Sequence, residues 1–183
     1  MKVAMSDERV VRQCSPTLAG IKTGNLFPCD DVLLRADIRK MNRKLVPKGL
    51  RMIPIRSRQR TLVYLYRPGR LERDLQTPGA RRILMEQGYA SGSEGRMVMQ
   101  LVRRFGRDGG CFPHEVGLFL GYPPEDVEAF IHHRSDACCV GCWKAFGNKE
   151  QAQRKFTMFK KCTHTYCGLY EKGMPVEKLA VKE

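Results

Sequence analysis

The residues best suited to chemistry in this sequence are its eight cysteines. The densest group is Cys138, Cys139 and Cys142, in which Cys139 and Cys142 have the C-x2-C spacing of a zinc knuckle. Cys162 and Cys167 follow as a wider C-x4-C pair, which suits a zinc site less well. These five cysteines are candidate ligands of a zinc ion or an iron–sulfur cluster. Two alternatives stay open for them, a redox-active thiol pair and reduced structural thiols.

A second candidate is the segment 14–22, which combines a thiol, hydroxyls and a cation. Ser15 and the proline after it are typical of a helix start. If a helix begins there, its free amides and its dipole would lower the pKa of the Cys14 thiol and attract an anion. We therefore expect Cys14 to be a reactive thiolate and Ser15, Thr17 and Lys22 to bind an anion. The alternative is an ordinary capped helix with a buried cysteine.

His114 and Glu115 stand at another expected helix start, in a segment (112–133) that has the pattern of a helix-turn-helix. A histidine there can serve as acid, base or ligand, and Glu115 is a candidate beside it; a hydrogen-bonded structural histidine is the alternative. The second helix would begin with acidic residues, whereas phosphate contacts call for Lys or Arg. We therefore interpret the segment as a structural helical hairpin and expect His114 to line one concave surface with Cys14 and Lys22.

The net charge of +14 is concentrated between residues 35 and 107, where nineteen Lys and Arg stand against five acidic residues. Arginine favours oxyanions, because a guanidinium can donate two parallel hydrogen bonds to one of them. Arg35, Arg39 and Arg43 repeat every four residues and should form one stripe on a helix. If this region binds nucleic acid or another polyanion, these three arginines should form one continuous face together with Arg58, Arg60 and Arg67. The alternative is a solvated basic surface.

Local sequence signals predict the elements that must position these residues. Capping residues and apolar periodicity predict helices over 6–13, 17–22, 30–44, 70–76, 79–87 and 93–105. Residues 50–56 and 61–67 alternate as a β-hairpin, and the second run is apolar on both faces, so it should be covered. Asn148 and Gln151 form a capping pair for a final long helix to about residue 172, whose aromatic stripe should face the core.

These signals predict an α+β fold, a helix-rich single domain (1–183) with a small β-hairpin or sheet. Within it we distinguish a basic central module, about 35–107, and a helical, cysteine-rich C-terminal part, about 111–173. No apolar run approaches the roughly 18 residues that a membrane span needs, and the N-terminus has no signal-peptide pattern. We therefore expect a cytoplasmic protein with reduced thiols and no membrane partner.

Three motifs in order resemble one protein family. They are the run from Cys14 to Lys22 (CSPTLAGIK), the run from Pro113 to Pro123 (PHEVGLFLGYP), and GCWK at 141–144 followed by Lys161-Cys162 and Tyr166. The chain resembles, from about Val10 to about Leu179, the bacterial domain of unknown function 3793 family, seen mainly in anaerobic Firmicutes. The resemblance implies a cytoplasmic bacterial protein. It supplies no established activity, and no catalytic residue can be carried over from it.

Three functions remain open. The first, which the cysteines favour, is a thiol-bearing metal, cofactor or redox accessory protein. The second is a nucleic-acid or polyanion-binding module that uses the Arg-rich centre. The third is an enzyme on a small anionic substrate, with Cys14 or His114 in the chemistry, although no Ser/His/Asp order, Gly-rich phosphate loop or paired-carboxylate motif supports it.

Overall fold

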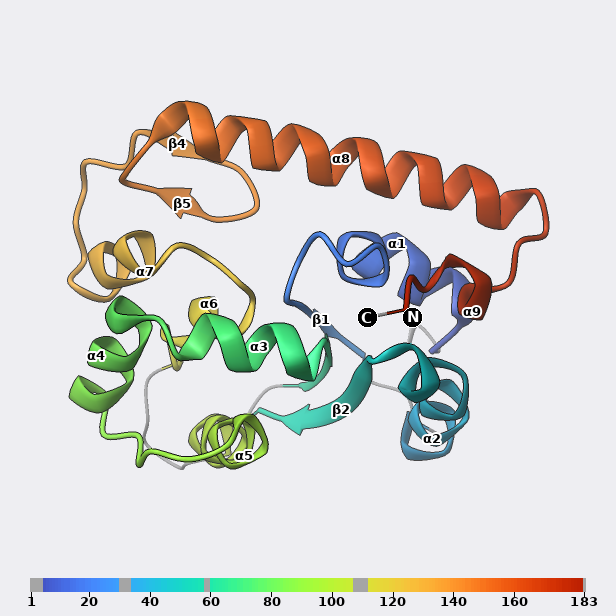
Figure 1. The fold of residues 1–183 in the computed structure, drawn as a ribbon, viewed down its shortest axis with the longest axis horizontal. Helices are drawn as coiled ribbons and strands as arrows, with labels where there is room; N and C mark the ends of the chain where they lie inside the picture. The colour runs from blue at the N-terminus through green and yellow to red at the C-terminus, as the bar shows by residue number, and fades with distance from the viewer. Residues whose placement is uncertain (1–4, 30–33, 58–59, 107–111, 183) are drawn as a thin grey trace.

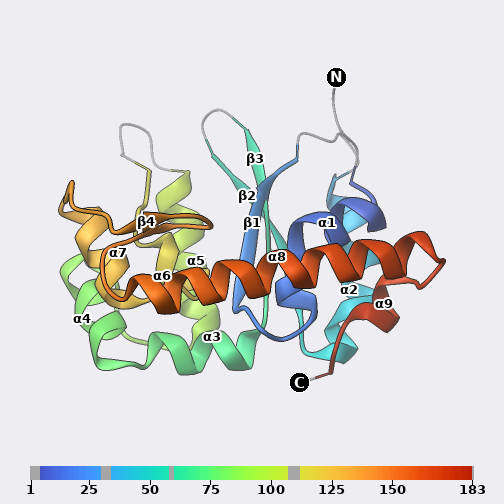
Figure 2. The same ribbon diagram turned by 90° about the horizontal axis from the view of Figure 1, so that it is seen from above.

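A three-stranded antiparallel sheet lies at the centre of the computed structural model, which describes residues 5–29, 34–57, 60–106 and 112–182. Its strands are β1 (Gly24–Pro28), β2 (Arg51–Arg56) and β3 (Thr61–Tyr66), in the order β1-β3-β2. Helices cover both faces of the sheet, as Figures 1 and 2 show. The predicted α+β fold class, a helix-rich single domain with a small sheet, is confirmed.

The predicted β-hairpin is confirmed, and β3 is the covered central strand that its two apolar faces indicated. Leu62 to Tyr66 are all buried, and β3 is paired on both sides. Strand β1 was not expected, because the sequence Gly24-Asn25 is typical of a residue pair that ends a helix. The structure needs a glycine at position 24, since a Cβ there would lie 2.7 Å from the Tyr64 ring.

One face of the sheet carries α3 (Pro68–Leu75), α4 (Pro78–Glu86), α5 (Glu94–Phe105), the single turn α6 (Val116–Phe119) and α7 (Pro124–Ile131). Tyr64 and Tyr66 project from β3 into this core and stack with ring centroids 4.6 Å apart. The Tyr64 hydroxyl donates a hydrogen bond to the Phe119 carbonyl over 2.6 Å. These helices confirm those predicted between residues 70 and 133.

The other face carries α1 (Asp7–Leu18), α2 (Leu34–Leu45), the short 3-10 helix η1 (Val46–Lys48) and α9 (Val176–Leu179). Val63 and Leu65 of β3 point into this second core. The predicted division into two short helices, 6–13 and 17–22, is wrong: α1 runs through Pro16. Its apolar stripe continues from Val10 to Leu18, so burial of one face outweighs the hydrogen bond that a proline removes. Residues 30–33, at the start of the helix predicted over 30–44, lie outside the described residues.

Arg67 joins the end of α1 to the sheet and to the C-terminal tail. Its side chain is 2% exposed and donates to the carbonyls of Thr17 (2.7 Å), Leu18 (2.8 Å) and Val181 (2.7 Å). The last carbonyls of a helix have no partner within it, so a buried cation there satisfies them and complements the helix dipole.

The long helix α8 (Lys149–Glu171) spans the whole molecule. In Figure 2 it crosses in front of the sheet, with α3 to α7 on one side and α1, α2 and α9 on the other. Its predicted start is confirmed, since the Asn148 side chain accepts a hydrogen bond from the Gln151 amide over 2.9 Å. The N-terminal half of α8 packs on a two-stranded sheet, β4 (Cys139–Val140) and β5 (Lys144–Ala145), through Trp143 and Phe156. Within the described residues, no helix is long and apolar enough to cross a membrane.

Candidate functional site

A groove of about 770 Å³ runs between α1 and α8, and we call it the α1–α8 groove. Three basic residues line it, Arg12 from α1, Lys22 from the α1–β1 loop and Lys160 from α8, against one acidic residue, Glu171. The wall also includes one histidine and two thiols, which are His164, Cys142 and Cys167.

Several hydrogen bonds hold the loop that carries Lys22. The backbone amides of Ile21 and Lys22 both donate to the Pro16 carbonyl over 3.0 Å, which turns the chain tightly after α1. Gly20, in the middle of this turn, has a φ of +75°, a conformation that favours glycine. Arg70 donates to the Gly20 carbonyl from α3. The position of Lys22 is therefore set by backbone contacts.

The side chain of Lys22 is largely buried at the wall of this groove. The side chain is 7% exposed, and within the described residues it makes no hydrogen bond or ion pair. Its Nζ lies over the ring of Tyr122, 5.4 Å from the ring centroid. The thiols of Cys142 and Cys14 are close enough to interact electrostatically with the Lys22 ammonium. Burial lowers the pKa of Lys22 from 10.5 to about 8, because the charged form loses its hydration.

Tyr122 is itself held in place by its neighbours. Its ring stacks on Trp143 with centroids 4.9 Å apart, and its hydroxyl donates to the Cys142 carbonyl over 3.1 Å. Trp143 in turn donates from Nε1 to buried Asp126 over 2.8 Å. Asp126 also accepts two backbone amide hydrogens from residues 146 and 147, so its carboxylate is satisfied at this structural junction. The aromatic wall beside Lys22 is thus preorganised.

A second groove of about 410 Å³ meets the first at Lys22, and Phe159 is the other residue that lines both. It carries Arg70 and Lys155 against Asp74 and Glu125. Asp74 accepts a hydrogen bond from the hydroxyl of Thr23, the residue after Lys22. Lys22 therefore stands where two solvent-accessible grooves converge.

Cys14 is not the reactive thiol predicted from the sequence. It lies within α1 and is fully buried in the core, because the helix begins at Asp7 instead of near Ser15. Burial raises the pKa of the Cys14 thiol, the reverse of the predicted lowering. Ser15 and Thr17 are also buried, and their hydroxyls donate to the Val11 carbonyl and to the Asn25 side chain. Of the anion-binding candidates in this segment, only Lys22 lines a groove.

His114 does not line the α1–α8 groove. It lines a separate, mostly apolar pocket of about 280 Å³, where its ring packs edge-on against Phe130 with centroids 5.0 Å apart. The α6 turn that follows it packs on the Tyr64 face of the sheet, whereas Cys14 packs on the opposite face. The prediction that Cys14, His114 and Lys22 share one concave surface is therefore wrong.

Glu115 is a buried cross-link between helices. It is 3% exposed, accepts a hydrogen bond from the Tyr89 hydroxyl over 3.0 Å, and lies 3.5 Å from the Arg104 guanidinium. Arg104 also covers the Tyr89 ring at 4.4 Å from its centroid. These contacts satisfy the carboxylate within the core and do not present it to a groove.

The predicted zinc or iron–sulfur site finds no support among the described residues, where no three metal-binding side chains come together. Cys138 donates from its thiol to the Ala145 carbonyl over 3.2 Å. The pKa of Cys139 is raised by burial and by Cys138, and that of Cys162 by burial. Cys142 and Cys167 instead line the α1–α8 groove.

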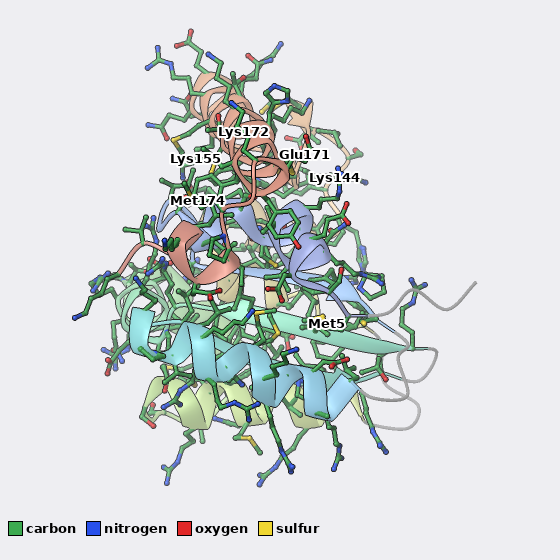
Figure 3. All side chains as sticks on the ribbon, turned by 90° about the vertical axis from the view of Figure 1, so that its right-hand side faces the viewer. Met5, Lys144, Lys155, Glu171, Lys172 and Met174 are labelled. Atoms are coloured by element: carbon green, nitrogen blue, oxygen red, sulfur yellow. The ribbon has the colours of Figure 1, made fainter. Side chains whose placement is uncertain are left out.

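The predicted arginine stripe on α2 is confirmed, since Arg35, Arg39 and Arg43 are all exposed. In Figure 3, which looks along α8 from the end where Glu171 and Lys172 lie, α2 is on the side of the molecule away from α8. The wider basic face is not formed as predicted. Arg67 is buried at the end of α1, and Arg58 lies outside the described residues.

Sequence reasoning missed most of the groove, although α8 carries a signal for it. Lys160, His164, Cys167 and Glu171 recur at steps of four, three and four residues, which places them on one helical face. Tyr122 stands in the segment 112–133, which we interpreted from the sequence only as a structural helical hairpin. Its role beside Lys22 depends on a contact between distant segments, which local patterns do not report.

Searches of curated proteins and of solved structures gave no match to this chain. One family model does match, over residues 10–180, and its description is "Protein of unknown function (DUF3793)". The match covers nearly the whole chain, including both faces of the sheet and all of α8. The chain therefore belongs to the DUF3793 family.

Proposed function

We propose that the protein binds a small organic anion, a carboxylate or a phosphate ester, in the α1–α8 groove. The observation that carries this proposal is the Lys22 side chain, which lines the groove, is only 7% exposed and has no acceptor among the described residues. An unpaired buried cation is costly, and an anion in the groove would supply the missing partner. The predicted cytoplasmic location, with its reduced thiols, is part of the proposal.

The charges around the groove support an anionic ligand. Arg12 and Lys160 are exposed at its walls, so they can hold an oxyanion while their side chains remain hydrated. Arg12 already bonds Glu8 at 2.8 Å and approaches Glu171 at 3.6 Å, which leaves other guanidinium donors for a ligand. Cys142 and Cys167 also line the groove. A thiol-bearing accessory protein, as predicted from the sequence, would therefore carry these two thiols beside its ligand.

Calorimetric titration with a panel of small carboxylates and phosphate esters, at low salt and about neutral pH, tests the proposal. We expect at least one compound to bind with a submillimolar Kd, and we expect Lys22→Met to weaken it at least tenfold. The matched control is Lys161→Met, which removes one lysine from the outward face of α8, where Arg154 and Met158 also lie. Equal binding by the wild-type and Lys22→Met proteins would place the anion elsewhere and overturn the proposal.

A second candidate function is polyanion binding through α2. Within the described residues, Arg35, Arg39 and Arg43 form no ion pair, so three like charges stand exposed on one stripe. Nucleic acid would relieve their repulsion and release counter-ions, which predicts affinity that falls steeply with salt. Gel-shift titration with single- and double-stranded DNA and RNA tests this function. Binding that survives replacement of all three arginines by glutamine would contradict it.

A further inference from the structure

We infer that the ligand of the α1–α8 groove carries an aldehyde or ketone beside its anionic group, and that Lys22 adds to this carbonyl to form an imine. The inference rests on the proposed function, because it names the class of anion that the same groove takes. It adds a covalent role for the neutral form of Lys22, and Arg12 and Lys160 then hold the charge of the ligand.

The placement of Lys22 separates it from the other cations of the groove. Arg12 and Lys160 are exposed, as is usual for residues that bind an oxyanion at a surface. Lys22 is 7% exposed, and this burial disfavours its charged form. A second, independent feature is that Lys22 lines both grooves, so it borders space that a carbonyl compound and water can occupy.

The chemistry balances without an oxidant or a metal. The lone pair of neutral Nζ attacks the carbonyl carbon, and the carbonyl oxygen takes up a proton to give a carbinolamine. Loss of that oxygen as water and of the remaining proton from nitrogen gives the C=N bond. Addition of water reverses the reaction and returns both the amine and the carbonyl compound. His164, which lines the groove from α8, is suited to carry the protons.

The acid–base properties of Lys22 fit this role. Burial is the largest influence on its pKa, which is about 8, and the thiols of Cys14 and Cys142 partly offset it. Glu171 is the carboxylate of the α1–α8 groove, and it lies 3.6 Å from Arg12. Near neutral pH the neutral fraction of Lys22 should therefore exceed that of an ordinary exposed lysine by about 100-fold or more.

The test uses pyruvate and glyoxylate as carbonyl-bearing anions and lactate as a matched anion without a carbonyl. Each is incubated with the full chain, cyanoborohydride is added to reduce any imine, and intact mass and peptide mapping locate the adduct. We expect one adduct at Lys22 with pyruvate or glyoxylate, none with lactate, and suppression of the adduct by excess lactate. The yield should rise with pH through about 8, in step with the neutral amine.

Two variants separate the covalent step from binding. Lys22→Arg keeps the cation and removes the nucleophile, so it should retain lactate binding and lose the adduct; Lys161→Met should behave as wild type. Binding of pyruvate without an adduct in the wild-type protein would overturn the imine and leave anion binding intact. An adduct spread over exposed lysines would also overturn it. If neither pyruvate, glyoxylate, lactate nor any anion of the wider panel binds, the proposed function itself fails.

Discussion

Replacement of Lys22 by methionine should stabilise the protein at neutral pH. A buried lysine whose pKa is lower in the folded than in the unfolded chain opposes folding, because the unfolded chain hydrates the charge better. Methionine keeps the length and apolar stem of the side chain and removes the charge. Most substitutions of buried residues destabilise, so an increase in stability would be specific to this reasoning.

The magnitude follows from the pKa change from 10.5 to about 8. Each pKa unit corresponds to about 1.4 kcal/mol, so the charged amine costs about 3 kcal/mol below pH 8. The ring of Tyr122, 5.4 Å from Nζ, returns about 1 kcal/mol as a cation–π contact. Lys22→Met should therefore raise the free energy of unfolding by about 2 kcal/mol at neutral pH, or Tm by roughly 4–8 °C for a chain of this size.

The sign of the pH dependence is fixed by proton binding. Between about pH 8 and 10.5 the unfolded chain keeps the Lys22 proton while the folded chain has lost it. The unfolded state then binds more protons, so the stability of the wild-type protein rises with pH relative to the variant. The advantage of Lys22→Met is complete below the folded pKa and is lost above the unfolded one. The pKa of Tyr122 is raised to about 12 by burial, so this neighbour titrates above the window.

Urea unfolding followed by circular dichroism, at about pH 7 and about pH 10, measures the difference between the two proteins. Other titrating groups are common to both and cancel in that difference. Lys161→Met, on the outward face of α8, should change stability by less than about 0.5 kcal/mol at either pH. The reasoning is refuted if Lys22→Met is less stable than wild type at pH 7, or if the difference does not change with pH. Either result would mean that the ammonium has an acceptor.

Three further predictions concern other parts of the structure. Arg67→Ala should cost about 3–5 kcal/mol, because it removes the three hydrogen bonds that this buried guanidinium donates; urea unfolding measures this, and a loss no larger than that of an exposed α2 arginine would contradict it. Gly121→Ala should lower the free energy of unfolding by about 1 kcal/mol or more, and therefore lower Tm, because φ is +79° and a Cβ would lie 2.5 Å from the Thr23 hydroxyl. An unchanged Tm would show that the turn can relax. Iodoacetamide should alkylate exposed Cys142 well before buried Cys14, whose thiol pKa is raised; peptide mapping that finds equal rates would show that α1 opens readily.

Local patterns predicted most elements of the fold. The hairpin, the helices from 70 to 105 and the Asn148 cap were all visible, because capping, proline placement and alternation act over a few residues. The errors lie where tertiary packing opposed a local signal. Pro16 predicted a helix start, yet the apolar stripe from Val10 to Leu18 keeps α1 continuous. The prediction of a reactive Cys14 thiol failed for the same reason, because it required a helix to begin next to Cys14.

The candidate site could be predicted only in part for a related reason. Lys22 was named from its own segment, but its burial depends on α8 and on Tyr122, which lie about a hundred residues or more away. Cysteine spacing suggested a metal site, yet Cys142, in the β4–β5 turn, lines the α1–α8 groove, and no three metal-binding side chains come together among the described residues. Spacing reports ligand geometry only when the intervening backbone is known.

Two buried cations near the end of α1 show why we assign function to one and structure to the other. Arg67 meets three carbonyls, two from the last turn of α1 and one from the C-terminal tail, so its charge completes hydrogen bonds that the fold would otherwise lack. Lys22 is nearly as buried, but within the described residues it meets an aromatic face and thiols and no acceptor. A charge that the fold neither needs nor satisfies opposes folding, and such groups concentrate at functional sites. The two side chains therefore differ in their hydrogen-bond acceptors. The fold supplies the acceptors of Arg67, whereas a ligand bound in the groove would supply the partner of Lys22.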